Sequence, residues 1–127
     1  MIIPGRVAIL GSGSWATAVA KIVQQNGADM YWYMRNADRI EQFKTFGHNP
    51  AYLSSVRFDV SRINFTTDIN EAVRHSDMVI FAMPSPYLKM HAEKIEASFR
   101  NKVVISVIKG IVADDNITIT EYLKSKF

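Results

Sequence analysis

A glycine-rich hexapeptide near the N-terminus constrains the fold of this chain more than any other feature. Residues 11–16 read Gly-Ser-Gly-Ser-Trp-Ala, directly after the apolar run 6–10 and directly before a segment with helical periodicity. A G-x-G-x-x-G/A pattern in that context is typical of the first strand, turn and helix of a dinucleotide-binding fold. Gly11 would permit the tight turn, Gly13 would let the backbone approach a pyrophosphate, and the small Ala16 would allow close packing of helix on strand. The alternative is a glycine turn that merely connects strand to helix.

The helix that follows is expected to bury one apolar stripe. Its candidates recur at helical spacing: Trp15, Ala18, Val19, Ile22 and Val23. Asn26-Gly27 predicts the end of the helix, because both residues tolerate the left-handed conformation.

The rest of the chain alternates short β-rich runs with helix-length segments. Further strands are expected at residues 29–34, 63–67, 77–82 and 102–107. Helices are expected to begin at Asp38, with Glu41 completing a capping box, at Asp68, at Ser85, and at Asp115 or Asn116. The third of these is expected to continue through Leu88, His91, Ile95 and Phe99, and residues 47–63 are expected to form a long irregular connection. This order predicts an α/β fold, a doubly wound (Rossmann) parallel sheet flanked by helices.

Length and composition limit the classes of protein to which this chain can belong. The 127 residues suit one domain, residues 1–127, and a hydrophobic fraction of 48% suits a folded core. Uninterrupted apolar stretches reach six residues, far short of the roughly 20 that a membrane span needs. The chain shows no signal-peptide pattern and no cysteine, so we expect cytoplasmic residence without membrane association. The net charge of +3 arises from scattered residues, which argues against nucleic-acid binding, and the three histidines lack metal-ligand spacing, so no metal is expected.

Arg35 stands where a dinucleotide-binding fold places the residue that reads the adenosine ribose. This position lies about 20 residues past the glycine motif, and an NAD-specific site usually carries Asp or Glu there. A guanidinium can instead pair bidentately with a 2′-phosphate. NADP(H) is therefore favoured as the cofactor and NAD(H) stays open, as does the alternative that Arg35 is a solvated cation at a strand end.

Five segments together resemble one family, the bacterial-type NAD(P)-dependent glycerol-3-phosphate dehydrogenases. They are residues 11–20 (GSGSWATAVA), 33–35 (YMR), 49–53 (NPAYL), 82–85 (AMPS) and 108–111 (IKGI). Their order and spacing match over the whole chain, which is more specific than the glycine motif alone. The sequence departs from the family at Ala16, where Gly is usual, and at Ser54, where Pro usually follows Leu53.

The resemblance implies reversible hydride transfer between NAD(P)H and dihydroxyacetone phosphate, which yields sn-glycerol 3-phosphate, a phospholipid precursor. It implies cofactor contacts from Gly11, Ser12, Gly13, Ser14, Trp15, Ala16, Arg35, Tyr87 and Lys109. Lys109 would also contact the substrate. From the residues alone, Lys109 follows an apolar strand at the ligand-binding edge of the sheet, although a solvated lysine would look the same. Tyr87 could equally be a core aromatic in the first turn of a helix.

The family's proton-transferring lysine and most of its substrate contacts lie in a helical C-terminal domain, to which nothing in this sequence corresponds. The resemblance therefore implies a nucleotide domain truncated before its last strands, which holds no catalytic residue and binds a dinucleotide without turnover. A bare sheet edge would make a homodimer plausible. Two alternatives stay open: the nucleotide domain of another two-domain dehydrogenase, of the ketopantoate-reductase or 3-hydroxyacyl-CoA-dehydrogenase type, and a stand-alone module that senses dinucleotides.

Overall fold

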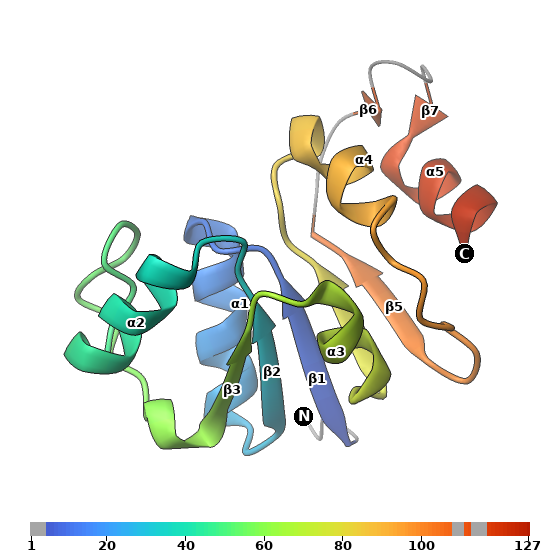
Figure 1. Cartoon of the computed structure of the whole chain (residues 1–127). Helices are drawn as coiled ribbons and strands as arrows, with labels where there is room; N and C mark the ends of the chain where they lie inside the picture. Colours follow the sequence, from blue (N-terminus) through green and yellow to red (C-terminus); the bar gives the residue numbers. More distant parts are fainter. Residues whose placement is uncertain (1–4, 108–110, 113–116) are drawn as a thin grey trace.

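Five parallel strands form the central sheet of the computed structural model, which describes residues 5–107, 111–112 and 117–127 (Figure 1). Their order across the sheet is β3-β2-β1-β4-β5. The strands are β1 (Arg6–Leu10), β2 (Asp29–Tyr33), β3 (Ile63–Thr66), β4 (Met78–Phe81) and β5 (Val103–Ser106). The chain adds strands outward from β1 to β3 and then returns to place β4 on the other side of β1. This confirms the predicted doubly wound fold and all five predicted strands.

Helices cover both faces of the sheet at its central strands, and alternate residues of each strand point to opposite faces. In β1, Val7 and Ile9 pack on the side of α1 and α2, whereas Ala8 and Leu10 pack on the side of α3, α4 and α5. All four side chains are fully buried. The helices are α1 (Ser14–Gln25), α2 (Ala37–Phe46), α3 (Ile69–Arg74), α4 (Ser85–Ala92) and α5 (Ile119–Lys126).

The buried face of α1 differs from the predicted stripe. Ala16, Thr17, Ala20 and Val23 are buried, whereas Trp15 is 67% exposed and Ile22 is 51% exposed. The prediction was wrong at these two positions because the helical spacing of large apolar residues was used to choose the buried face. A helix that packs closely on a strand needs small side chains at the contact, and the alanines supply them.

Three predicted helix boundaries were also wrong. Asn36 rather than Asp38 caps α2, because its side-chain oxygen accepts hydrogen bonds from the N–H groups of Asp38 and Arg39. Pro84 takes the cap position of α4, so that Ser85 is the first helical residue rather than the cap. This helix ends at Ala92, before the predicted Ile95 and Phe99. Asp68 caps α3 as predicted.

Two short strands after β5 pair with each other before the last helix. β6 (Ile111–Val112) pairs antiparallel with β7 (Ile117–Thr118), and α5 begins at Ile119 with the Thr118 hydroxyl as its cap. The prediction of a helix that includes Ile117 was therefore wrong. The predicted starts Asp115 and Asn116 lie outside the described residues. Within the connection 47–63, a single 3₁₀ turn (Val60–Arg62) precedes β3.

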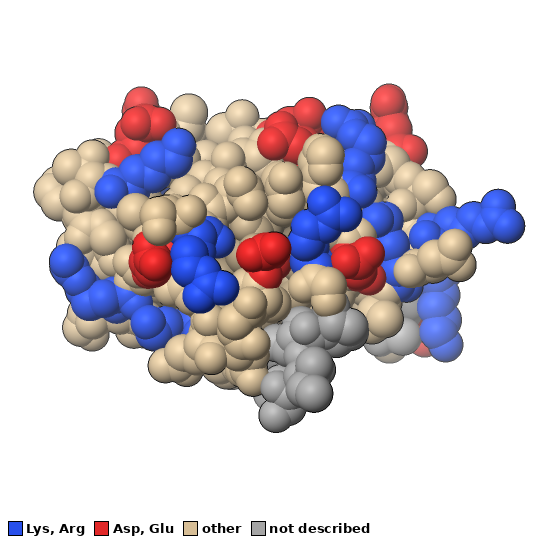
Figure 2. Space-filling view, turned by 90° about the horizontal axis from the view of Figure 1, so that it is seen from below, with Lys and Arg blue, Asp and Glu red and all other residues tan. Residues whose placement is uncertain are grey.

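Charged side chains are mixed on the face of the molecule seen from below in Figure 1. Figure 2 shows lysine and arginine side chains interspersed with aspartate and glutamate over this face.

None of the helices in the described part of the chain combines the length and apolar character needed to cross a membrane.

Replacing Gly11 by Ala is expected to destabilise the fold at the junction of β1 and β4. Gly11 has a φ of +128°, and a Cβ there would lie 2.5 Å from the Ala82 carbonyl oxygen. Because that atom belongs to a central strand connection and cannot move aside, Gly11→Ala should lower the free energy of unfolding by about 2–4 kcal/mol. Urea unfolding followed by circular dichroism measures this.

Gly13→Ala is the matched control. Gly13 has a φ of −82°, and a Cβ there would meet no atom within 4 Å. The free energy of unfolding of Gly13→Ala should differ from that of the wild type by less than about 1 kcal/mol. Equal stability of the two variants would contradict the assigned role of Gly11.

Candidate functional site

The candidate site lies where the sheet changes its winding direction, at the carboxyl ends of β1 and β4. In open α/β sheets the connections diverge at this point and leave a crevice for ligands. Two adjoining cavities occupy it, one of about 270 Å³ and one of about 560 Å³. We call the first the arginine cavity; it is lined by Gly11, Ser12, Gly13, Tyr33, Arg35, Arg39, Tyr52, Met83, Pro84, Tyr87 and His91. We call the second the tryptophan cavity; it is lined by Gly13, Ser14, Trp15, Tyr52, Ala82, Met83, Pro84, Ser85 and Val107.

The glycine turn is held in place by hydrogen bonds from the neighbouring strand. The Gly11 N–H donates to the Tyr33 carbonyl oxygen at 3.2 Å. The indole N–H of the buried Trp32 donates to the Gly11 carbonyl oxygen at 2.6 Å. Because both partners belong to β2, the end of β1 has a fixed direction when it enters the turn.

The N-terminus of α1 opens beside both cavities. Gly13 is its cap residue, no side chain caps it, and no acidic residue stands in its first turn. The first N–H groups of a helix lack partners within the helix and form the positive end of its dipole. The absence of a Cβ at Gly13 also leaves its backbone open to close approach. This end of α1 is thus arranged to bind an anion.

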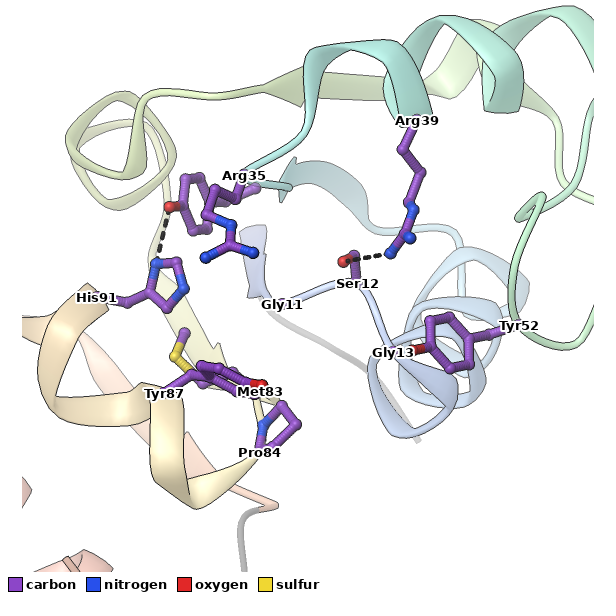
Figure 3. Close-up of a pocket in the computed structure, with 11 residues that line it drawn as sticks. Gly11, Ser12, Gly13, Arg35, Arg39, Tyr52, Met83, Pro84, Tyr87 and His91 are labelled. Atoms are coloured by element: carbon purple, nitrogen blue, oxygen red, sulfur yellow. Dashed lines mark hydrogen bonds between the residues drawn. The ribbon is translucent and has the colours of Figure 1, made fainter.

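Two arginines bring positive charge into the arginine cavity. Arg35 follows β2 and Arg39 comes from the first turns of α2, and both point toward the glycine turn (Figure 3). Arg39 Nη1 lies 3.4 Å from Ser12 Oγ, and its guanidinium lies 5.7 Å from the ring centre of Tyr52. Among the described residues, the ion pairs are Lys44 with Glu41 and Arg74 with Asp68, so neither cavity arginine is neutralised by a carboxylate.

A buried tyrosine–histidine pair forms the opposite wall of the arginine cavity. The Tyr33 hydroxyl and His91 Nδ1 lie 2.9 Å apart, and His91 is only 7% exposed. Burial lowers the pKa of His91, and the positive charges of Lys94 and Arg35 lower it further. Burial raises the pKa of Tyr33, against a smaller opposing effect of Arg35. The pair is therefore neutral near pH 7, and the cavity's net charge comes from its arginines.

The structure brings together most residues that the sequence singled out. Gly11, Ser12, Gly13, Arg35 and Tyr87 line the arginine cavity, and Ser14 and Trp15 line the tryptophan cavity. Ala16 is a buried residue of α1 that packs against the sheet and lines neither cavity. Tyr87 is 51% exposed, so the alternative of a core aromatic was wrong. Lys109 lies outside the described residues.

Several cavity residues were not predicted. Arg39, Tyr52, Met83, Pro84 and His91 line the arginine cavity. Arg39 could have been found, because it stands four residues after Arg35, in the first turn of the helix that follows β2. Tyr52 sits in the irregular connection 47–63 and His91 in a helix, and neither carries a local signal for its place. No group of three or more potential metal ligands occurs in the part of the chain that the structure describes.

Comparison with known proteins gives a consistent result at the level of sequence. A family model described as the N-terminus of NAD-dependent glycerol-3-phosphate dehydrogenase matches residues 6–127. A glycerol-3-phosphate dehydrogenase (NAD(P)+) of Teredinibacter turnerae is 31% identical over 95% of this chain and 36% of its own length. The corresponding protein of Bacillus subtilis is 32% identical over 94% of this chain and 34% of its own length. The chain thus spans about a third of the relatives it matches.

Solved structures show the same fold. The glycerol-3-phosphate dehydrogenase of Plasmodium falciparum superposes with a TM-score of 0.82 at 23% identity, covering 98% of this chain and 38% of that one. The enzyme of Coxiella burnetii superposes with a TM-score of 0.77 at 20% identity, covering 95% of this chain and 37% of that one.

The lowered pKa of His91 predicts a loss of stability in mild acid. Because the folded-state pKa lies below the unfolded value of about 6.5, the unfolded chain binds more protons in the window below that pH. The contribution of His91 to stability is therefore fully present above about pH 6.5 and is lost as the pH falls through the folded-state pKa. The free energy of unfolding of His91→Gln should consequently fall less than that of the wild type between about pH 7.5 and pH 5. Urea titrations at a series of pH values measure the difference, and identical pH profiles would contradict the prediction.

Proposed function

Because this chain belongs to the NAD-dependent glycerol-3-phosphate dehydrogenase family and matches its N-terminal, NAD-binding part, we propose that it holds a nicotinamide dinucleotide across the two cavities. The observation that carries this proposal is the uncapped N-terminus of α1, which opens between them at the switch point of the sheet. A pyrophosphate there would meet free N–H groups and the positive dipole end. When bound, the cofactor supplies the hydride that the family's reaction transfers.

The two cavities differ in chemistry as the two halves of a dinucleotide do. The arginine cavity, with its two guanidinium groups, suits the adenosine half and its phosphate. The tryptophan cavity is lined mainly by apolar side chains, including the exposed Trp15. It suits the nicotinamide half, because an uncharged wall excludes water from a reacting ring. Ser14 and Trp15 would contact the cofactor on this side, and Tyr87 on the other.

Arg35 and Arg39 favour NADP(H) over NAD(H). A 2′-phosphate adds about two negative charges near neutral pH. Two guanidinium groups without carboxylate partners among the described residues can bind it by charge-assisted hydrogen bonds. A carboxylate in the place of Arg35 would repel it. NAD(H) would also enter the site, but with fewer contacts.

The activity of the whole protein is part of the proposal. We propose that residues 1–127 act as the dinucleotide-binding domain of a cytoplasmic enzyme that reversibly reduces dihydroxyacetone phosphate to sn-glycerol 3-phosphate, a glycerophospholipid precursor. Lys109 would contact both cofactor and substrate. The chain spans about a third of its relatives, and we place the proton-transferring residue outside residues 1–127.

The edge of the sheet supports a further part of the proposal, a homodimer. Val103, Val104 and Ile105 in β5 are 51%, 37% and 38% exposed, and β5 pairs only with β4 among the described strands. Exposed apolar edge strands favour pairing with another strand. We propose that two copies associate along β5, which size-exclusion chromatography at increasing protein concentration would detect.

Removing either cavity arginine should weaken NADPH binding selectively. Charge-assisted hydrogen bonds to a phosphate justify a loss of about tenfold to a hundredfold in NADPH affinity for Arg35→Ala, and about tenfold for Arg39→Ala. NADH affinity should change by less than about threefold, because NADH lacks the phosphate. Isothermal titration calorimetry with both cofactors measures these changes.

Arg74→Ala serves as the control, because Arg74 pairs with Asp68 and lines neither cavity. Its affinities should equal those of the wild type. Equal wild-type affinity for NADPH and NADH, or unchanged NADPH binding by Arg35→Ala, would refute the role in 2′-phosphate recognition.

The 127-residue chain should bind NADPH without reducing dihydroxyacetone phosphate. General acid–base catalysis and substrate positioning each contribute several powers of ten in rate, and the proposal assigns both to residues outside this chain. The decrease in NADPH absorbance over time, followed at a high concentration of the chain, measures turnover. Substrate-dependent oxidation of NADPH by the purified chain would overturn this part of the proposal.

A further inference from the structure

Asn49 is a fully buried polar side chain in an otherwise irregular connection. It is 0% exposed, although it stands in the segment 47–63 that joins α2 to β3. Its amide Nδ2 donates to the Ser12 carbonyl oxygen at 3.0 Å and to Thr17 Oγ1 at 2.9 Å. Its Oδ1 accepts from the N–H groups of Ala51 and Tyr52 at 2.9 Å and 3.2 Å. Both hydrogens and both lone pairs of the amide are therefore used.

These four hydrogen bonds join three separate parts of the site. Ser12 belongs to the glycine turn, Thr17 to α1, and Tyr52 to the connection itself. Thr17 extends the network, because its hydroxyl donates to the Gly13 carbonyl oxygen at 2.8 Å. Asn49 thus holds the turn directly at Ser12, and holds Gly13 through Thr17.

The parts that Asn49 joins form the wall between the two cavities. Gly13 and Tyr52 line both the arginine cavity and the tryptophan cavity. Tyr52 also lies beneath the guanidinium of Arg39, which in turn approaches Ser12 Oγ. Because Arg39 is carried by α2, a shift of the connection would move Tyr52 relative to both Arg39 and the glycine turn.

We propose that Asn49 is a positioning residue that sets the spacing between the glycine turn and Tyr52, and thereby aligns the two cavities for one dinucleotide. This inference rests on the proposed dinucleotide function. A ligand that spans both cavities needs the shared wall in one position, whereas a ligand confined to the arginine cavity can adjust to a displaced wall. Loss of Asn49 should accordingly affect NADPH more than 2′-AMP, which carries only the adenosine, ribose and 2′-phosphate part.

Asn70 provides a matched control for ordinary structural destabilisation. Its amide donates to the Lys94 carbonyl oxygen at 2.9 Å and accepts from the N–H groups of Glu96 and Ala97 at 2.7 Å and 2.9 Å. Like Asn49 it ties an irregular connection to a helix, but it lines neither cavity. A purely structural role for Asn49 would make the two alanine variants equivalent in ligand binding.

The test measures NADPH and 2′-AMP affinity by calorimetry for the wild-type chain, Asn49→Ala and Asn70→Ala, well below their melting temperatures. We expect Asn49→Ala to weaken NADPH binding by about tenfold and 2′-AMP binding by less than about threefold. Asn70→Ala should leave both affinities within about twofold of wild type, even with a lower melting temperature. NADPH affinity within twofold of wild type for Asn49→Ala, or equal weakening of both ligands, would overturn the inference.

Thr17→Val keeps the inference testable if Asn49→Ala does not fold. Valine has the shape of threonine but removes the hydroxyl that links Asn49 to Gly13. We expect NADPH binding to weaken by about threefold to tenfold with 2′-AMP binding nearly unchanged, and an unchanged NADPH affinity would count against the network. A wild-type chain that binds no dinucleotide at all would refute the proposed function itself, and the inference with it.

Discussion

The close approach of the chain leaving β1 to the chain leaving β4 is the constraint on which the rest of this structure depends. A Cβ on Gly11 would lie 2.5 Å from the Ala82 carbonyl oxygen, so only glycine fits there. Parallel pairing holds β1 against both β2 and β4. The glycine turn must therefore leave the sheet at the switch point, and α1 must begin directly beside the crevice. The site follows from this geometry before any polar side chain is considered.

Electrostatics around the crevice favours anions by several independent contributions. The N-terminus of α1 has no side-chain cap and no acidic residue in its first turn. Arg35 and Arg39 add two full charges, and the buried His91 adds none near neutral pH because burial lowers its pKa. Although the net charge of the chain is only +3, positive potential is concentrated at the crevice. A ligand with several phosphates can use all of these contacts at once, which a single phosphate cannot.

The sequence-based predictions were accurate for the strands and less accurate for the helix caps and for the buried face of α1. The central strands β1, β2 and β4 were found because burial on both faces produces unbroken apolar runs. The caps at Asn36 and Pro84 were missed by two residues and one residue, because several residues near each helix start could serve. The buried face of α1 was misjudged because Ala16, Thr17, Ala20 and Val23 also recur at helical spacing and form the contact with the sheet, whereas Trp15 is 67% exposed beside a cavity.

Local patterning and the steric requirements of single residues were enough to predict the five strands of the sheet, the glycine turn and the position of Arg35 near it. The assembled fold was needed to show that Arg39, Tyr52 and His91 share one cavity, and that Asn49 connects the glycine turn to the connection 47–63. An isolated asparagine or tyrosine has no periodic signal that would reveal such a role. Its role arises from hydrogen bonds and contacts between residues distant in the chain, such as Asn49 and Ser12, which form only when the sheet and its helices are assembled.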